Sequence, residues 1–269
     1  MKLMEIQAIS PKGIKANKKL GQHFLIDESV AELEASFGRG KRVIEIGPGL
    51  GMLTVKLCKY AKSVLAIEKD SRLCTLLSGT LQCDRLSIIN SDFFAVEPRI
   101  LSGYEIMISN VPYLLSSKII DWLTVSRLEA VLCLQKEFVD RMLATVGDRK
   151  YSRLSVMSAL TLEVEQVAEV KAEQFYPKPK VDSAVVHITP KDIEISERER
   201  ELIKLIMEHK KKTLRNAIID SSKALGISKE DSKKLSESIG LQNERVFRIS
   251  PKDLLNISGG ISEKLHLLE

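Results

Sequence analysis

Short β-like runs alternate with helical patterns between residues 27 and 144, and this alternation constrains the fold more than any other feature of the chain. Strands that alternate with helices pair in parallel, and the crossovers between them are right-handed. The sequence therefore predicts an α/β fold, a parallel sheet covered by helices in three layers. The expected strands are 43–46, 63–67, 86–89, 105–109 and 130–134, and the expected helices are 27–38, 52–58, 72–81, 117–125 and 137–144.

The composition and the hydrophobic pattern of the sequence change toward the C-terminus. Two β-like runs, 164–170 and 184–188, follow each other with no clear helix between them, and they can form an antiparallel pair at the sheet edge. Beyond Pro190 the chain is rich in Glu, Lys, Leu and Ile without a strand pattern, which predicts two or three helices. We therefore divide the chain into a sheet domain, 1–190, and a small helical domain, 191–269.

Composition excludes several classes of protein. The longest purely apolar runs have about five residues, whereas a membrane span needs about 20, and the N-terminus lacks the apolar core of a secretory signal. The four cysteines have no zinc-like spacing. We expect reduced thiols, no metal, no membrane partner, a cytoplasmic location and a monomer. The net charge of +5 permits a nucleic-acid partner but does not require one.

A glycine-rich turn lies between the first expected strand and the helix that follows it. Glycine lets the backbone turn sharply and lets a ligand approach closely. The spacing is G-x-G-x-G and not the G-x-G-x-x-G of dinucleotide folds, and an acid there suits the cationic sulfonium of S-adenosylmethionine better than a pyrophosphate. Two alternatives to a site for S-adenosylmethionine remain. The glycines can serve only to reverse the chain, or the protein can be an NAD-dependent oxidoreductase. The residues are Glu45, Gly47, Gly49 and Gly51.

Acidic residues also follow the next two strands. Glu68 ends the second strand, where a carboxylate can accept hydrogen bonds from both ribose hydroxyls of an adenosine-containing ligand. Asp92 follows the third strand and can accept from the amino group of an adenine, although such a residue is also a common helix cap or turn residue. Ligands bind at the carboxyl ends of strands in open α/β sheets. The three acids therefore predict a nucleoside-containing cofactor at this edge.

The turn Asn110-Val111-Pro112-Tyr113 follows the fourth strand at the same edge. Proline stiffens the turn and keeps Val111 out of the α region, which fixes the Asn110 side chain relative to the Val111 carbonyl. Two fixed acceptors can grip the two hydrogens of an adenine N6 amine and free its lone pair, while Tyr113 stacks on the base. A purely structural turn is the alternative.

Further motifs accompany this turn, and together they resemble the small-subunit ribosomal RNA adenine N6,N6-dimethyltransferase family over essentially the whole chain. Two departures are mild: Val111 replaces the usual Leu or Ile, and Ser152 replaces the usual Gly. The matching segments are Lys19-Leu20-Gly21-Gln22-His23-Phe24-Leu25, Glu45 to Gly51, Glu68, Asp92, Asn110 to Tyr113, Gln135-Lys136-Glu137, Tyr151 to Val156, and the F-x-P-x-P-x-V-x-S segment from Phe175 to Val186.

The resemblance implies a Rossmann-like methyltransferase that transfers methyl groups from S-adenosylmethionine to N6 of two adjacent adenosines near the 3′ end of small-subunit rRNA. It also implies a substrate inside an immature small subunit, a role in biogenesis, and an RNA-recognition role for the helical domain. Phe175 is expected to sandwich the flipped adenine against Tyr113, or else to pack in the core. The implied cofactor contacts are His23, Leu25, Gly47, Glu68, Asp92 and Asn110.

Basic residues gather in four short clusters, three of which adjoin the motifs above. Each cluster is either a solvated face or a grip on the RNA backbone, which base flipping requires beside the pocket. A methyltransferase of large-subunit rRNA or DNA and a non-catalytic assembly factor remain alternatives. The clusters are Lys12, Lys15, Lys18 and Lys19; Arg149, Lys150 and Arg153; Lys178 and Lys180; and Lys210, Lys211, Lys212 and Arg215.

Overall fold

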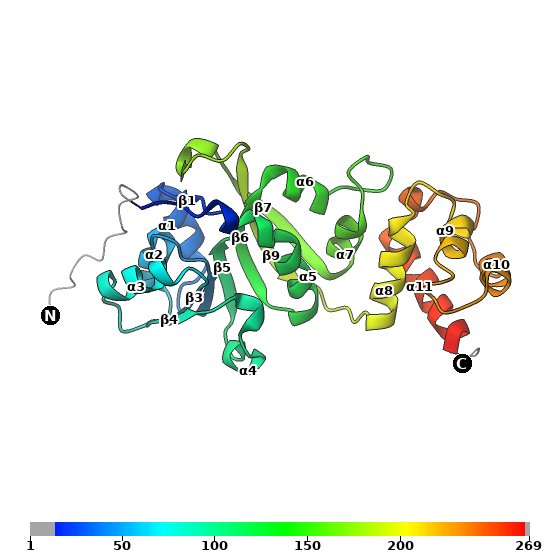
Figure 1. Cartoon of the computed structure of the whole chain (residues 1–269), viewed down its shortest axis with the longest axis horizontal. Coiled ribbons are helices and arrows are strands. Elements are labelled where there is room, and N and C mark those ends of the chain that lie inside the picture. The colour runs from blue at the N-terminus through cyan, green and yellow to red at the C-terminus, as the bar shows by residue number, and fades with distance from the viewer. Residues whose placement is uncertain (1–13, 267–269) are drawn as a thin grey trace. The chain divides into compact units, whose positions relative to one another are not determined.

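The computed structural model describes residues 14–266 (Figure 1), and Lys12 of the first basic cluster lies outside them. The strands are β1 Phe24–Leu25, β2 Arg42–Ile46, β3 Ser63–Glu68, β4 Leu86–Asn90, β5 Ile106–Asn110, β6 Glu129–Gln135, β7 Leu162–Val170, β8 Phe175–Tyr176 and β9 Ser183–Pro190. The α-helices are α1 Glu28–Ser36, α2 Met52–Tyr60, α3 Ser71–Thr80, α4 Pro98–Leu101, α5 Ser116–Ser126, α6 Lys136–Met142, α7 Arg153–Thr161, α8 Glu197–Glu208, α9 Leu214–Asp220, α10 Lys229–Glu237 and α11 Pro251–His266. Short 3-10 helices cover Lys18–Leu20, Phe93–Ala95, Tyr113–Leu115, Ala172–Gln174 and Val246–Arg248.

Seven strands form the central sheet, in the order β4-β3-β2-β5-β6-β9-β7. The first five run parallel, and β9 joins β6 in the antiparallel direction. The predicted α/β fold is confirmed, and the two late β-like runs are neighbours at one end of the sheet. The helix predicted after Asp27 begins where its carboxylate accepts hydrogen bonds from the amides of Ser29 and Val30.

Helices α1 and α2 pack side by side on the sheet (Figure 1). Their apolar side chains meet those of β2, β5 and β6 in one core. This core determines where α1 lies relative to the end of β5, which matters for the site below. Two short strands were not predicted. Phe24 of β1 pairs with Tyr176 of β8, and Leu25 pairs with Phe175, so two distant motifs form one small antiparallel ribbon.

The chain divides into two compact units, and this corrects the predicted boundaries. The first unit runs to Val139 and resumes at 164–190, while the second combines 140–163 with the chain from Lys191 onward. The predicted end of the sheet domain at residue 190 coincides with the point where the first unit ends. The segment 140–163, which the prediction placed in the sheet domain, belongs to the second unit.

The reason for this correction lies in the packing of α7. Its side chains Val156, Met157 and Leu160 are buried in an apolar core with residues of α8, α9, α10 and α11. The hydroxyl of Tyr151 donates a hydrogen bond to the carbonyl of Ile249, at 3.0 Å. The change of amino-acid composition after Pro190 marks the point where the chain enters the second unit for good. It does not indicate that an earlier helix, α7, already belongs to the core of that unit.

Residues 14–266 contain neither a membrane-spanning helix nor a cluster of metal ligands. None of their helices has the length and apolarity that crossing a membrane requires. Across the same residues, no three His, Cys, Asp or Glu side chains are grouped as a metal ion would need.

The core of the second unit leads to a stability prediction. Met157→Ala removes a buried side chain from that core, so we expect it to lower the free energy of unfolding by about 2–5 kcal/mol. Hydrogen exchange followed by mass spectrometry should show faster exchange in α8 and α11, with β2 and β3 unchanged.

The control is Leu154→Ala on the same helix, because Leu154 is only partly buried and is not a member of that core. It should have a smaller effect. Faster exchange confined to β2 and β3 in Met157→Ala would contradict the assignment of α7 to the second unit.

Candidate active site

The site lies where the strand order of the sheet reverses. The chain moves outward from β2 through β3 to β4 and then returns to the other side of β2 as β5, which leaves a crevice at the carboxyl ends of β2 and β5. The glycine turn follows β2 at this point. Gly49 has a φ of +59°, and a Cβ there would lie 2.9 Å from the ring of Phe24, so a side chain is excluded by both backbone and space.

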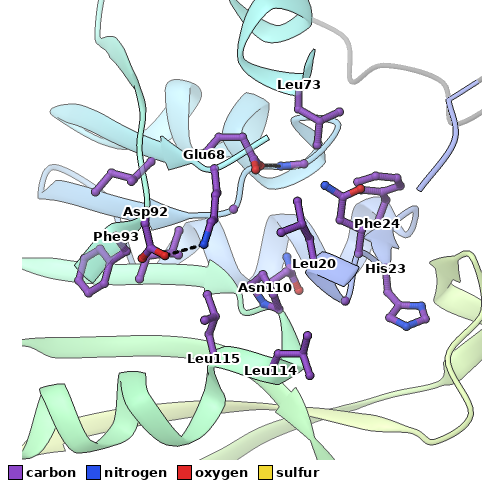
Figure 2. Close-up of a pocket in the computed structure, with 18 of the residues that line it drawn as sticks. Leu20, His23, Phe24, Glu68, Leu73, Asp92, Phe93, Asn110, Leu114 and Leu115 are labelled. Carbon is purple, nitrogen blue, oxygen red and sulfur yellow. Dashed lines mark hydrogen bonds and ion pairs between the residues drawn. The ribbon is translucent and has the colours of Figure 1, made fainter. Parts of the chain in front are cut away.

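A cavity of about 180 Å³ occupies this crevice (Figure 2). It contains most of the predicted cofactor residues, since His23, Gly47, Gly49, Glu68, Asp92 and Asn110 all line it. Leu25 and Glu45 line a smaller adjoining pocket. Eight Leu, Ile and Phe residues form an apolar part of the cavity wall. Leu20, Phe24 and Ile46 belong to the matching segments, whereas the motif analysis did not single out Ile67, Leu73, Phe93, Leu114 and Leu115.

Gly51 does not line either pocket. Its φ is +81°, it caps α2, and a Cβ at this position would lie 3.0 Å from Leu77 and 3.1 Å from Leu81. The described geometry therefore gives Gly51 a packing role behind the cavity.

The carboxylate of Glu68 is fixed by backbone amides. It accepts from the amide of Asp70 at 2.8 Å and from that of Gly49 at 3.3 Å, and the second bond ties the end of β3 to the glycine turn (Figure 2). Burial raises the pKa of Glu68. Its position is suited to accept hydrogen bonds from the hydroxyls of a ligand.

Asp92 forms an ion pair with Lys69 at 2.8 Å (Figure 2) and accepts from the amide of Phe94 at 3.0 Å. Lys69 lowers the pKa of this carboxyl, so Asp92 is a fixed anionic acceptor beside the cavity. Sequence reasoning missed Lys69. Its position directly after Glu68, at the end of a strand, was the available signal.

Glu45 is almost completely buried, with 1% of its surface exposed. Burial raises its pKa to about 8, and the nearby charges of Glu34 and Glu68 act in the same direction. Its Oε2 atom has no hydrogen-bond partner among the described residues. A cationic ligand nearby would stabilise the charged form of this carboxyl.

Asn110 ends β5, and its Nδ2 donates a hydrogen bond to Oε2 of Glu34, at 3.0 Å. Glu34 lies on α1 and is fully buried, and burial raises its pKa to about 8. Sequence analysis did not single out this residue. It lies four residues after Val30 and three before Phe37, so an acid on the apolar face of the helix was the signal.

Tyr113 is held through its hydroxyl group and through one face of its ring. Its hydroxyl lies 2.7 Å from the hydroxyl of Ser183, and burial raises the pKa of the phenol to about 12, so Tyr113 stays neutral. The His23 imidazole stacks on the ring with centroids 5.6 Å apart. Nδ1 of His23 donates to the carbonyl of Pro177 at 2.6 Å, because a carbonyl oxygen can only accept.

A small third pocket brings the remaining predicted residues together. Val111, Pro112, Tyr113 and Phe175 line it along with Asn110. Phe175 is 4% exposed and also packs in the core of the sheet, so its ring is placed by apolar contacts before any ligand enters.

Four residues of the basic clusters form exposed ion pairs within their own units. Lys178 pairs with Glu173, Lys150 with Asp140, Lys212 with Asp220 and Arg215 with Glu237. Exposed pairs of this kind contribute at most about 1 kcal/mol, so a phosphate can replace the carboxylate at small cost. Lys19 differs from these residues because it lines the main cavity itself.

The site and the sheet together define the class. A Rossmann-like sheet with an acid at the end of β3, a glycine turn after β2 and an Asn-Val-Pro-Tyr turn after β5 has the architecture of a methyltransferase. The sequence model of the family described as "Ribosomal RNA adenine dimethylase" matches residues 13–257. The chain therefore belongs to this family of rRNA adenine N6,N6-dimethyltransferases.

Curated relatives agree over nearly the full length. The chain is 39% identical to a "Probable ribosomal RNA small subunit methyltransferase A" of Thermococcus sibiricus, covering 93% of each chain. It is 38% identical to the protein of the same name from Pyrococcus abyssi, covering 95% of each.

Solved structures show the same fold. A dimethyladenosine transferase from Plasmodium falciparum superposes with a TM-score of 0.73 at 27% identity, covering 90% of this chain and 98% of that one. The 23S rRNA methyltransferase ErmE has a TM-score of 0.59 at 24% identity, covering 89% of this chain and 99% of that one, and this likeness concerns the fold alone.

The two buried acids lead to a prediction about pH. Around neutral pH the folded chain retains protons on Glu34 and Glu45 that the unfolded chain, with carboxyl pKa values near 4.5, has released. The contribution of these two carboxyls to stability is therefore fully present below about pH 4.5 and is lost as the pH rises through about 8, by up to about 1.4 kcal/mol per pH unit for each carboxyl. Urea unfolding between about pH 6 and about pH 8.5 measures the slope.

Glu45→Gln should reduce this slope, since a glutamine does not titrate. The exposed Glu163 provides the control, and Glu163→Gln should leave the slope unchanged. An unchanged slope in Glu45→Gln would contradict the assignment of the effect to this carboxyl.

Proposed function

We propose that the chain transfers methyl groups from S-adenosylmethionine to N6 of two adjacent adenosines near the 3′ end of small-subunit rRNA. The substrate is the RNA within an immature small subunit, the protein acts as a monomer in the cytoplasm, and the reaction contributes to small-subunit biogenesis. Membership of the rRNA adenine dimethylase family and full-length relatives named for the small subunit support this proposal.

The residues around the cavity suit S-adenosylmethionine. When bound, this cofactor supplies the methyl group. Glu68 accepts from the ribose hydroxyls, Asp92 from the adenine amino group, and buried Glu45 complements a positive charge. The unpartnered Oε2 of Glu45 and the apolar cavity wall support this assignment. His23, Leu25, Gly47, Gly49 and Asn110 complete the proposed contacts, whereas Gly51 supports the turn from behind.

The Asn-Val-Pro-Tyr turn handles the target base. Oδ1 of Asn110 and the carbonyl of Val111 accept the two hydrogens of N6, which favours the pyramidal amine with an available lone pair. Pro112 holds the two acceptors in place. Tyr113 stacks on the base, with Phe175 as the second aromatic of the same pocket. These residues orient the amine for attack, and orientation is a large part of such a rate enhancement.

The helical second unit and the basic clusters bind the RNA around the flipped base. Flipping requires a few kcal/mol, which contacts to the neighbouring phosphates can supply. Structured RNA is recognised mainly through shape and backbone, so scattered lysines and arginines fit this role better than a base-reading helix.

The substrate is tested by methylation assays with purified immature small subunits, naked large-subunit rRNA and duplex DNA. We expect methyl transfer to the small subunits alone, with mass spectrometry of the digested RNA showing two N6,N6-dimethyladenosines near its 3′ end. Methylation of only large-subunit rRNA or DNA would contradict the proposal.

The role of Asn110 gives a second prediction. Asn110→Ala should abolish methyl transfer because one of the two acceptors for the amine is lost, while the affinity for S-adenosylmethionine, measured by calorimetry, largely survives. Gln82→Ala, at an exposed position of the first unit that lines none of the three pockets, is the control and should retain full activity. Full activity in Asn110→Ala would overturn the assigned role.

A further inference from the structure

Only one of the two polar atoms of the Asn110 carboxamide has a hydrogen-bond partner among the described residues. Its Nδ2 donates to Oε2 of Glu34, whereas Oδ1 is buried and has no partner in the part of the chain that the structure describes. A buried acceptor without a donor destabilises a protein by about 1–3 kcal/mol. Such an atom calls for an explanation, and a donor that arrives with the substrate provides one.

Glu34 is placed to control this carboxamide. It lies on the face of α1 that carries the buried residues Val30, Ala31 and Ala35, and α1 packs against β5, the strand that ends in Asn110. Glu34 has no exposed surface. Burying a carboxyl group is unfavourable unless it is hydrogen-bonded, and the structure shows one such bond, to Asn110.

The bond determines which end of the carboxamide faces the substrate. In the observed orientation Oε2 of Glu34 is the acceptor, so the NH2 group of Asn110 faces it and Oδ1 faces away. Without this acceptor, the two orientations that differ by a half-turn of the amide would be close in energy. In the reversed orientation an NH2 group would face the hydrogens of an incoming amine and repel them.

We propose that Glu34 is a positioning residue of the methyltransferase, which holds the Asn110 carboxamide with Oδ1 available to accept a hydrogen from the target amine. The inference rests on the function proposed for Asn110.

The geometry works in both protonation states of the carboxyl. The other oxygen of Glu34, Oε1, is also buried without a partner among the residues described here, and it can carry the proton. Oε2 then still accepts from Nδ2 of Asn110. A proton on Oε2 would instead make the carboxyl a donor to Oδ1 of a reversed amide, so the ionised carboxylate holds the observed orientation most strictly.

Kinetics provide the first test. Glu34→Leu replaces the carboxyl group with an apolar side chain of similar size and so removes the acceptor, and we expect kcat to fall about tenfold, less than the roughly 100-fold loss from a 1 Å misplacement. The KM for S-adenosylmethionine should stay within about twofold, since the cofactor is bound mainly by other residues. Glu34→Gln keeps an acceptor oxygen, so its kcat should lie between those of Glu34→Leu and the native protein.

The control is Glu32→Leu on the same helix. Glu32 points to α2, where its carboxylate pairs with Lys56 and Lys59, so its loss removes an acid from α1 without touching Asn110. We expect a kcat within about twofold of the native value, and denaturant unfolding of each variant separates loss of stability from loss of rate.

A second readout needs neither substrate nor cofactor. In protein labelled with ¹⁵N at asparagine, the side-chain NH2 resonances of Asn110 are identified by their loss in Asn110→Ala. They should shift with pH in the native protein as the Glu34 carboxyl titrates, and they should move in Glu34→Leu but not in Glu32→Leu. The measurement on the native protein applies even if Glu34→Leu does not fold.

Two results would overturn the proposal: a folded Glu34→Leu with kcat within about twofold of the native protein, or Asn110 resonances insensitive to both pH and the loss of Glu34. The test is separable from that of the function itself. If the native protein methylated no RNA, the proposed function would fail, while the NMR measurement would still report whether Glu34 holds the Asn110 amide.

Discussion

Parallel pairing of β2 with both β3 and β5 is the constraint on which the rest of the site depends. Ile44 of β2 faces Leu65 on one side and Met107 on the other, so the three strands finish at the same edge of the sheet. This register places the glycine turn, Glu68 and Asn110 together, because each lies at or just after the end of one of these strands. A shift of one residue would turn every side chain on a strand to the opposite face.

Burial of acids is the second theme of the site. Glu34, Glu45 and Glu68 are at most 5% exposed, and burial raises the pKa of each. Asp92 differs, since Lys69 lowers its pKa. The free protein therefore holds carboxyl groups with raised pKa values at the place where a positively charged cofactor is proposed to bind, and perturbed pKa values of this kind are common at functional sites.

Much of this could be predicted from the sequence, for physical reasons. Strand ends in a parallel sheet meet at one edge, so Glu45, Glu68 and Asp92 could be grouped from periodicity alone. Glu34 could not be assigned a partner, because the contact between α1 and β5 is tertiary. The ribbon between Leu25 and Phe175 joins two-residue strands distant in the chain, which are too short for any periodic signal.

The chain enters the second unit in the segment 140–163, which contains α7, returns to the first unit, and enters the second unit again after Pro190. This order has a consequence for folding during translation. Tyr151 and the carbonyl it binds, that of Ile249, are 98 residues apart, and a ribosome adds about 5–20 residues per second. For roughly 5–20 s the apolar face of α7 therefore exists without the complete set of helices that cover it. During that interval the apolar side chains of α7 are exposed on the nascent chain, and a chaperone or a neighbouring nascent chain can bind them.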